Sequence, residues 1–335
     1  MPPNAVILLN LGGPDTLSAV QPFLVNLFSD PDIFRLPLGT VVQKPLARII
    51  ARWRAPHVAE HYRRIGGGSP ILAHTRAQAQ RLAEKLAPVL DAAVYVGMRY
   101  WHPFIREAID QAVQEGARRL ILLPLYPQFS FTTTGSSLRE VERLIEEKRL
   151  TSIERVTIRS YPDHPLYVQA VGERIVEALR EFSDDELMRW GLIFSAHGVP
   201  VRFITDGDPY LAETQRSVAA VLDHLRHRPE VALAVSRAQT ILSFQSKVGP
   251  LKWLEPTTVD AVKRLAEEGI ENLVVVPISF VSDHVETLYE LDIEVREIAH
   301  RFGIKKFVLV RALNDSDTFA EALKALVLEA ISHDA

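Results

Sequence analysis

Residues 191–200, GLIFSAHGVP, place an apolar run directly before a histidine, a glycine and a proline. The apolar run predicts a buried strand that ends near His197, because Gly198 and Pro200 interrupt regular structure. Open α/β sheets bind their ligands at the carboxyl ends of the strands. His197 is therefore a candidate functional residue, although a histidine in such a place more often has a structural role.

A stretch near the N-terminus, AVILLNLGGP at 5–14, has the same order of apolar run, glycine and proline. Aligning the two stretches sets Leu11 opposite His197. A further pair of segments, RRLILLPLYPQF at 118–129 and ENLVVVPISFVS at 271–282, aligns in the same way, with one proline opposite the other. We interpret these matches as two similar lobes, although any two strand-to-helix turns share apolar runs and glycine.

Short apolar runs alternate with longer, amphipathic and charged segments along the whole chain. This alternation predicts β–α–β units that form parallel sheets. We expect an α/β fold of two Rossmann-like, doubly wound lobes whose strand-end loops face a central cleft. The eight expected strands, four in each lobe, are 5–11, 93–98, 119–125, 154–159, 191–196, 240–245, 272–279 and 306–311.

The composition excludes several classes of protein. Of the 335 residues, 47% are apolar and 24% are charged, an ordinary mixture for a globular chain long enough for two cores. The formal net charge of -4 argues against a general nucleic-acid binder, since phosphate affinity requires an excess of Lys and Arg. The chain has no cysteine, which excludes disulfides, thiolate metal sites and iron–sulfur clusters. Any metal must be bound by histidine, carboxylate or carbonyl groups.

The apolar runs are all shorter than the roughly 18 residues of a membrane-spanning helix, and no basic leader precedes the first expected strand. We therefore expect a cytoplasmic protein. Residues 43–56, QKPLARIIARWRAP, predict a helix with an apolar stripe flanked by basic residues, as in helices that lie on an anionic bilayer. A core-facing helix has the same pattern, so peripheral contact with the inner face of a membrane is one of two interpretations.

A row of glutamates follows the strand expected at 272–279. Ser282 or Asp283 can cap a helix on which four glutamates recur at spacings of four, four and three, and therefore share one face. The four are Glu286, Glu290, Glu294 and Glu297. Solvated acidic faces usually carry Lys or Arg at the next turn, whereas here only Arg296 is nearby. The row can guide a cation toward His197 or carry protons away from it, and a solvated face remains the alternative.

Other polar and aromatic residues follow expected strand ends. Trp253, in a loop rich in glycine and proline, offers a flat surface for stacking on a planar ligand, or else belongs to the core. Arg99 can hold a carboxylate through two hydrogen bonds, or it has a structural role. TTTGSSLREVERL at 132–144 can seat an anion at a helix N-terminus, with Thr134 or Ser136 as the cap, although most such stretches are only caps. YRRIGGGSPI at 62–71 lacks the Lys-Ser/Thr of a phosphate loop, which argues against nucleotide binding.

Several long, ordered motifs together resemble the ferrochelatase family, whose members insert ferrous iron into a porphyrin to make haem. The resemblance extends from about residue 5 to about residue 325, through LNLGGPDT, YRRIGGGSPI, YPQFSFTTTGSS, FSAHG, QSKVGPLKWLEP and SDHVETLYELDIE. It implies two Rossmann-like lobes around a porphyrin cleft, with the last helix returning to the first lobe. We therefore expect a first lobe of residues 1–165 and 316–335, and a second lobe of residues 166–315 that carries the catalytic residues.

The resemblance also implies roles for individual residues. His197 resembles the family's metal- and proton-handling histidine, and Glu286 its catalytic partner. Glu290 and Glu294 match an acidic ridge on a π-type helix, so the expected metal contacts are His197, Glu286, Glu290 and Glu294. The helix at 45–54 matches an apolar lip at the cleft mouth. The expected porphyrin contacts are Leu11, Arg99, Tyr100, Tyr126, Ser136, Trp253, Phe280 and His284.

The expected activity is insertion of Fe(II) into protoporphyrin IX, which forms protohaem in the last step of haem biosynthesis. Fe(II) is then a substrate, and no cofactor is required. The lack of cysteine excludes the carboxyl-terminal iron–sulfur extension of some family members and the dimer contact that it supports, so we expect a monomer. Two alternatives are insertion of iron into coproporphyrin III and a tetrapyrrole carrier without chemistry. The order in which His197 and Glu286 meet the metal stays open.

Overall fold

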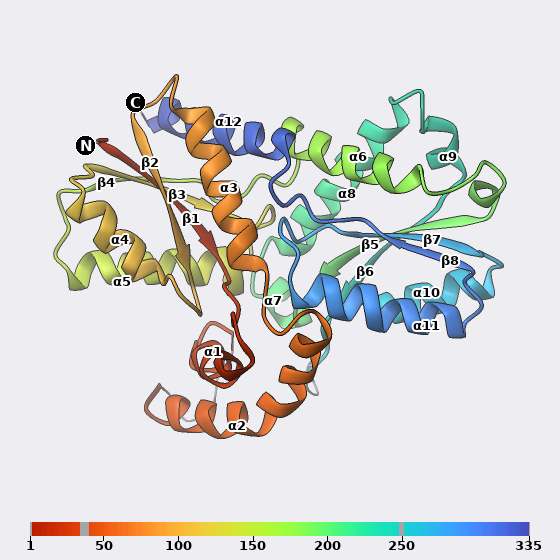
Figure 1. The fold of residues 1–335 in the computed structure, drawn as a ribbon, viewed down its shortest axis with the longest axis horizontal. Coiled ribbons are helices and arrows are strands. Elements are labelled where there is room, and N and C mark those ends of the chain that lie inside the picture. Colours follow the sequence, from red (N-terminus) through yellow and green to blue (C-terminus); the bar gives the residue numbers. More distant parts are fainter. Residues whose placement is uncertain (1, 34–39, 248–250, 335) are drawn as a thin grey trace. The chain divides into compact units, whose positions relative to one another are not determined.

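The computed structural model describes residues 2–33, 40–247 and 251–334 (Figure 1). The chain divides into two compact units, one formed by Met1–Ser160 with Leu323–Ala335 and the other by Tyr161–Ala322. These bounds differ by several residues from those expected from the sequence. Each unit contains one four-stranded parallel sheet, which confirms the expected α/β class.

The sheet of the first unit has the strand order β2-β1-β3-β4. Its strands are β1 (Asn4–Asn10), β2 (Ala92–Met98), β3 (Arg119–Pro124) and β4 (Glu154–Thr157). Every residue of β1 is buried. Ile7 and Leu9 pack against α4 (Ile105–Gln114) and α5 (Ser136–Glu147). Successive residues of a strand point to opposite faces, so a strand that is apolar throughout needs cover on both.

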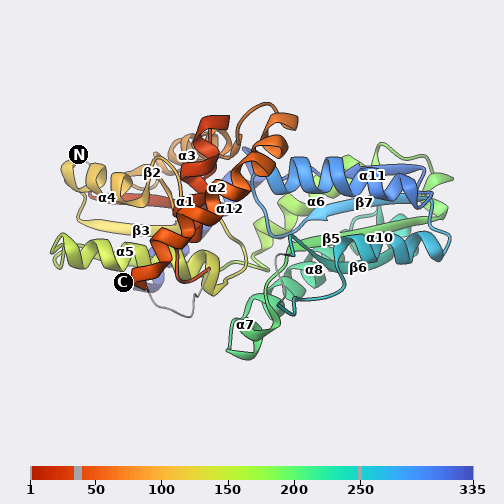
Figure 2. The ribbon, with the colours of Figure 1, turned by 90° about the horizontal axis from the view of Figure 1, so that it is seen from below.

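The sheet of the second unit has the equivalent strand order, β6-β5-β7-β8. Its strands are β5 (Trp190–His197), β6 (Gln239–Gln245), β7 (Asn272–Pro277) and β8 (Lys306–Leu309). All eight strands expected from the sequence are confirmed, with ends that differ by a few residues. The helix α6 lies on one face of this sheet, whereas α10 and α11 lie on the other, where Ile193 and Val275 meet them (Figures 1 and 2).

The register of the two sheets confirms the alignment of the two halves of the chain. The terminal proline of β3 pairs with Leu9 in β1, and the terminal proline of β7 pairs with Ser195 in β5. The residues two positions farther along, Leu11 and His197, are therefore equivalent. Each unit thus has one central strand that ends at the same topological position.

The remaining helices connect and cover the strands. In the first unit they are α1 (Val20–Phe28), α2 (Thr40–Arg64) and α3 (Ile71–Leu86), with the 3-10 turn η1 (Leu17–Ala19) and the π-helix η2 (Phe131–Gly135). In the second unit they are α6 (Pro165–Leu179), η3 (Glu186–Met188), α7 (Val201–Thr205), α8 (Tyr210–Arg226), α9 (Ala232–Arg237), α10 (Thr258–Glu267), the π-helix η4 (Glu286–Val295) and α11 (Arg296–Arg301). The last helix, α12 (Asp317–Asp334), contributes residues to both units. Within the described part of the chain, none of the helices combines the length and apolar character needed to cross a membrane.

Candidate functional site

The carboxyl end of β5 and the first residue of η4 bring His197 and Glu286 together. Nδ1 of His197 lies 2.8 Å from Oε2 of Glu286. The His197 side chain is 37% exposed and that of Glu286 is 20% exposed. The pair is therefore shielded enough for a strong charge interaction and open enough for a ligand to reach it.

The backbone at the end of β5 is held in place from several sides. The hydroxyl of Tyr210 donates to the carbonyl of His197 at 2.8 Å and lies 2.7 Å from Oγ of Ser279. The amide of Gly198 donates to the carbonyl of Gln245 at 2.8 Å. A Cβ atom at Gly198 would come within 2.7 Å of that carbonyl, so only glycine fits this approach. His197 is thereby presented on a fixed strand end.

The two members of the pair shift each other's pKa. Burial lowers the pKa of His197, but the Glu286 carboxylate outweighs burial and the pKa is raised overall. Burial raises the pKa of Glu286, yet the charge and hydrogen bond of His197 bring it down to about 2. The pair therefore favours its ionised form, an imidazolium next to a carboxylate.

The π-helix η4 confirms the π-type helix that the resemblance implied. Ser246, just after β6, donates its amide to Oε1 of Glu290 at 2.7 Å and its hydroxyl to Oε2 at 2.6 Å. The same hydroxyl lies 3.4 Å from Oε2 of Glu286. Ser246 has a φ of 65°, a left-handed conformation unusual for a residue other than glycine. The sequence analysis did not identify Ser246 as a site residue. Its position directly after β6, the strand next to β5, could have indicated it.

Glu290 has a pKa very different from that of Glu286. Burial raises the pKa of Glu290, and the negative charge of Glu286 raises it further, to about 7. Two carboxyl groups on one helix thus have pKa values that are pushed apart, an arrangement typical of sites that exchange protons. Glu286 keeps its charge, whereas Glu290 can gain or lose a proton near neutral pH.

The row of glutamates does not form the single unpaired face that its spacing predicted. Glu286 and Glu290 are partly buried, whereas Glu294 and Glu297 are exposed. A π-helix has a wider turn than an α-helix, so residues four apart do not stay in line along it. Glu297 lies 4.0 Å from Arg301. Arg296, the expected neighbouring cation, forms its ion pair with Asp292 instead.

Phe280 and His284 lie beside the pair. The ring of Phe280 meets that of His197 edge-on at 6.3 Å and that of His284 at 4.6 Å. His284 is 4% exposed, and its Nδ1 lies 3.0 Å from the carbonyl of Ser282. Its Nε2 lies 4.0 Å from Oε1 of Glu286, and burial lowers its pKa. A neutral His284 thus backs Glu286, while Phe280 offers an apolar surface next to His197.

Trp253 lies next to the end of β5. It forms an antiparallel bridge with Pro200, and its ring would lie 3.3 Å from a Cβ atom at Gly198. The side chain is partly exposed, so it is neither a fully buried core residue nor a free surface. Among the described residues its buried Nε1 has no hydrogen-bond partner. Residues 248–250 of the motif that contains Trp253 lie outside the described residues.

Three of the expected porphyrin contacts in the first unit converge on a residue that the sequence did not suggest, Asp30. Its Oδ2 accepts hydrogen bonds from Arg99 at 3.0 Å, from the Tyr100 hydroxyl at 2.5 Å and from the Ser136 hydroxyl at 2.5 Å. Tyr100, Ser136 and Asp30 are buried. The carboxylate that Arg99 holds is thus an internal one, which favours the structural alternative for this arginine.

The other two expected contacts in this unit lie at strand ends. Leu11 follows β1 and Tyr126 follows β3, and both are half-buried. The carbonyl of Leu11 accepts a hydrogen bond from the amide of Tyr100 at 3.0 Å. Across the described residues, no group of three or more His, Asp or Glu side chains is arranged to hold a metal ion.

The apolar stripe of α2 faces outward. Ile49 is 67% exposed and Trp53 is 84% exposed, whereas the buried face of the helix carries Gln43, Ala47 and Ala51. The core-facing interpretation is therefore wrong for Ile49 and Trp53, whereas Leu46 and Ile50 of the same stripe are half-buried. Lys44, Arg48 and Arg52, which flank the stripe, are exposed as well.

Comparison with known proteins gives a consistent family. A family model described as Ferrochelatase matches residues 3–331. A ferrochelatase of Gloeobacter violaceus is 46% identical over 327 residues, which cover 97% of this chain and 96% of that protein. A ferrochelatase of Cyanothece is 48% identical over 329 residues, which cover 97% of this chain and 82% of that protein.

A solved structure shares the fold. The sirohydrochlorin chelatase SirB from Bacillus subtilis subspecies spizizenii, in complex with cobalt, superposes with a TM-score of 0.55. The match covers 98% of this chain and 96% of that chain, at 13% sequence identity. Similarity at this level of identity concerns the arrangement of strands and helices alone.

The raised pKa of Glu290 predicts that the protein loses stability as the pH rises. In the unfolded chain the Glu290 carboxyl has a pKa of 4.5, so the folded state binds this proton more tightly. The stability that the bound proton contributes is therefore complete below pH 4.5 and is lost as the pH rises toward about 7. Between about pH 5 and about pH 8, the urea midpoint of the unaltered protein should fall further than that of Glu290→Gln. Glu294→Gln, at an exposed position, should follow the unaltered protein. Equal falls in all three proteins would mean that Glu290 titrates normally.

Proposed function

This chain belongs to the ferrochelatase family, and on that basis we propose that His197 and Glu286 are its catalytic pair. The protein is a metal chelatase that inserts Fe(II) into a porphyrin. The observation that supports the residue assignment is the 2.8 Å contact between Nδ1 of His197 and Oε2 of Glu286 at the carboxyl end of β5.

The reaction sets requirements that the pair can meet. Fe(II) must shed water, the flat ring must buckle, and two protons must leave the inner nitrogens as the metal binds. Nδ1 of His197 is engaged by Glu286, so Nε2 is the ring nitrogen that can meet an inner N–H group or the metal, after the imidazolium has given up its Nε2 proton. The carboxylate of Glu286 stabilises the imidazolium that results from proton transfer, because opposite charges attract strongly in a shielded site.

The protons need a route out of the site, since His197 has a raised pKa and holds a proton once it has accepted one. The Ser246 hydroxyl lies within 3.4 Å of Glu286 and within 2.6 Å of Glu290. Glu290, with a pKa of about 7, can take up such a proton at neutral pH and release it again. We assign Glu290 and the exposed Glu294 to this proton exit and to entry of the metal.

The aromatic residues next to the pair would hold the ring. Phe280 is edge-on to His197, and Trp253 packs at the adjacent strand end. Binding energy from such apolar contacts can strain the porphyrin toward the buckled transition state. His284 would act on Glu286 rather than on the ring, because it is buried behind that residue. The contacts expected at Leu11 and Tyr126 stay predictions.

Replacement of either member of the pair should slow metal insertion. His197→Ala and Glu286→Gln should each lower kcat by at least about a hundredfold, because each removes a positioned proton-transfer group. The dissociation constant of the porphyrin, followed by fluorescence quenching, should change by less than about tenfold, because apolar contacts hold the ring. Glu294→Gln should raise the apparent KM for the metal more than it lowers kcat.

A different pattern would contradict the assignment. If His197→Ala lowers only the stability, and the folded protein keeps nearly normal turnover, His197 is structural. If the unaltered protein binds porphyrin but inserts neither Fe(II) nor Zn(II), the protein is a carrier and not a chelatase.

We propose protoporphyrin IX as the preferred substrate. Coproporphyrin III has four propionates and would favour more cationic partners than protoporphyrin. Among the described residues, the side chains that contact His197 and Glu286 are acidic, aromatic, imidazole, hydroxyl or amide groups, and Arg99 is engaged by Asp30. With Fe(II), kcat/KM should be higher for protoporphyrin IX than for coproporphyrin III in parallel assays. Faster turnover of coproporphyrin III would reverse the substrate assignment.

We further propose a cytoplasmic monomer that touches an anionic membrane through α2. The support is the outward apolar stripe of Ile49 and Trp53 with basic residues on its flanks. The protein should bind phosphatidylglycerol vesicles in a salt-sensitive way, and the double variant Ile49→Ser, Trp53→Ser should bind less. Equal binding to neutral vesicles at high salt would indicate a purely apolar contact. Lack of binding to either vesicle would rule out the membrane assignment.

A further inference from the structure

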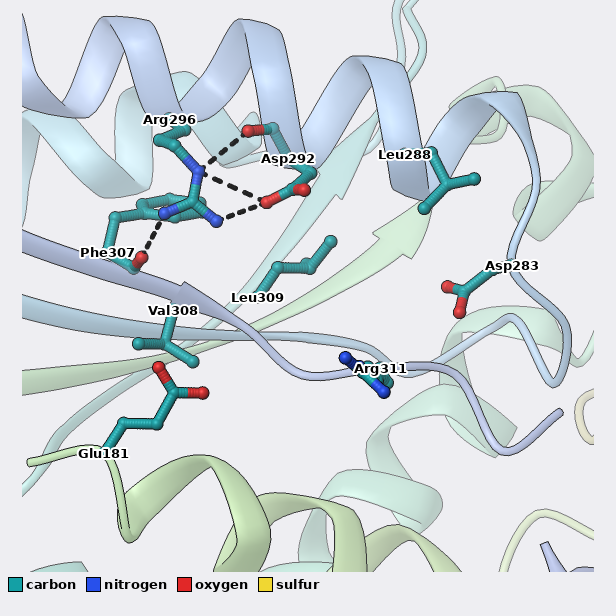
Figure 3. Close-up of a pocket in the computed structure, with 9 residues that line it drawn as sticks. All are labelled: Glu181, Asp283, Leu288, Asp292, Arg296, Phe307, Val308, Leu309 and Arg311. Carbon is teal, nitrogen blue, oxygen red and sulfur yellow. Dashed lines mark hydrogen bonds and ion pairs between the residues drawn. The ribbon is translucent and has the colours of Figure 1, made fainter. Parts of the chain in front are cut away.

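A cavity of about 350 Å³ lies in the second unit, between η4, α11 and the edge strand β8 (Figure 3). Leu288 and Asp292 of η4 line it. Leu288 lies two positions after Glu286, and Asp292 lies two positions after Glu290. Helix residues two apart do not share a face, so the cavity lies on the side of η4 away from the catalytic pair. Its volume is at the lower end of the range for small-molecule sites. It is therefore a separate place for a small ligand.

The floor of the cavity is the open edge of the sheet. β8 is the last strand in the order β6-β5-β7-β8, and Phe307 and Leu309 of β8 contribute apolar surface. Nη1 of Arg296 donates to the carbonyl of Phe307, and its guanidinium lies 4.8 Å from the centre of the Phe307 ring. Arg296 thereby satisfies a backbone carbonyl on the unpaired side of the edge strand. A small molecule fits this floor better than an added peptide strand does.

Three of the charged side chains around the cavity already have polar partners. Nε of Arg296 donates to the backbone carbonyl of Asp292 at 2.9 Å, and Nη2 forms the ion pair with the carboxylate of the same residue. The carboxylate of Asp283 accepts 2.7 Å and 3.1 Å hydrogen bonds from Asn314 and Thr287. These groups shape the cavity but have little remaining capacity for a charged ligand.

Two charged side chains of the lining, Arg311 and Glu181, have no such partners. Within residues 2–33, 40–247 and 251–334, no hydrogen bond or ion pair engages the guanidinium of Arg311 or the carboxylate of Glu181. They come from different segments, Arg311 from just after β8 and Glu181 from just after α6. Figure 3 shows them apart from each other, with the apolar Val308 and Leu309 along the strand that lies near both. The cavity thus offers one cation and one anion, both exposed, near the edge strand whose Val308 and Leu309 point to opposite faces.

We propose that this cavity binds a small zwitterion whose carboxylate and ammonium groups are joined by an aliphatic chain. The carboxylate would pair with Arg311, whose planar guanidinium suits a two-pronged contact. The ammonium group would pair with Glu181, and the chain would cover Leu288 and Leu309. A ligand that carries both charges can form both contacts, whereas a ligand with one charge can form only one. The proposal does not depend on the catalytic assignment of His197 and Glu286.

Titration calorimetry on the full-length protein tests this with three matched probes: 6-aminohexanoate, hexanoate and hexylamine. The first carries both charges, the second only the carboxylate and the third only the ammonium group. 6-Aminohexanoate should bind saturably at one site, and each of the other two probes should bind at least about tenfold more weakly. Absence of saturable binding of 6-aminohexanoate to the unaltered protein would overturn the proposal.

Charge-removing variants assign the two ends of the ligand. Arg311→Gln should weaken 6-aminohexanoate and hexanoate by at least about tenfold and leave hexylamine unchanged, whereas Glu181→Gln should weaken 6-aminohexanoate and hexylamine and leave hexanoate unchanged. Arg301→Gln removes an exposed arginine on α11 outside the cavity, and it should leave all three probes unchanged. Equal melting temperatures would show that the variants are folded. Loss of affinity that does not follow the charge of the probe, or equal loss in Arg301→Gln, would contradict the proposed site.

Discussion

A partly buried carboxylate keeps its charge only where other groups stabilise it, and Glu286 is stabilised by its contact with His197. Burial alone would neutralise Glu286, but the adjacent imidazolium keeps it charged and brings its pKa to about 2. Burial, together with the charge that Glu286 retains, then raises the pKa of Glu290 to about 7. One ion pair therefore fixes the protonation of its neighbours as well as its own. The surrounding structure, from Tyr210 to Ser246, holds these groups at hydrogen-bonding distance.

The π-helix η4 lets a single element serve two surfaces. Glu286 and Glu290 lie toward the end of β5, whereas Leu288 and Asp292 line the cavity over β8. One side carries Glu286 and Glu290, whose pKa values lie far apart, while the other side carries the Asp292–Arg296 ion pair. The side of η4 near β5 thus has carboxyl groups that a ligand can reach, whereas the charge of Asp292 on the cavity side is compensated by Arg296. Glu286 and Glu290 can therefore face a ligand on a helix whose other side is linked to β8 through Asp292 and Arg296.

The fold was more predictable from the sequence than the site. Apolar runs flanked by glycine and proline reveal the strands, and the equivalence of Leu11 with His197 follows from local similarity, because both are short-range signals. Asp30 was missed because its partner Arg99 is 69 positions away, and no local pattern records such a contact. Ser246 and Tyr210 were missed for the same reason. The glutamate row was predicted as one face because its spacing was interpreted with α-helical geometry, which η4 does not have.

The repeated topology explains how one architecture yields one reactive strand end. Both units end their central strand at the same register, yet the first places Leu11 there and the second places His197. The fold supplies the position, and the residue at that position supplies the chemistry. A structure with 13% identity can share the architecture through conserved packing alone, which says nothing about the residue at the strand end. A histidine at this position gains its reactivity only because the segment that follows β7 returns with Glu286 at its helix start. The proposed catalytic role therefore depends on the juxtaposition of β5 with η4, and neither element would supply it alone.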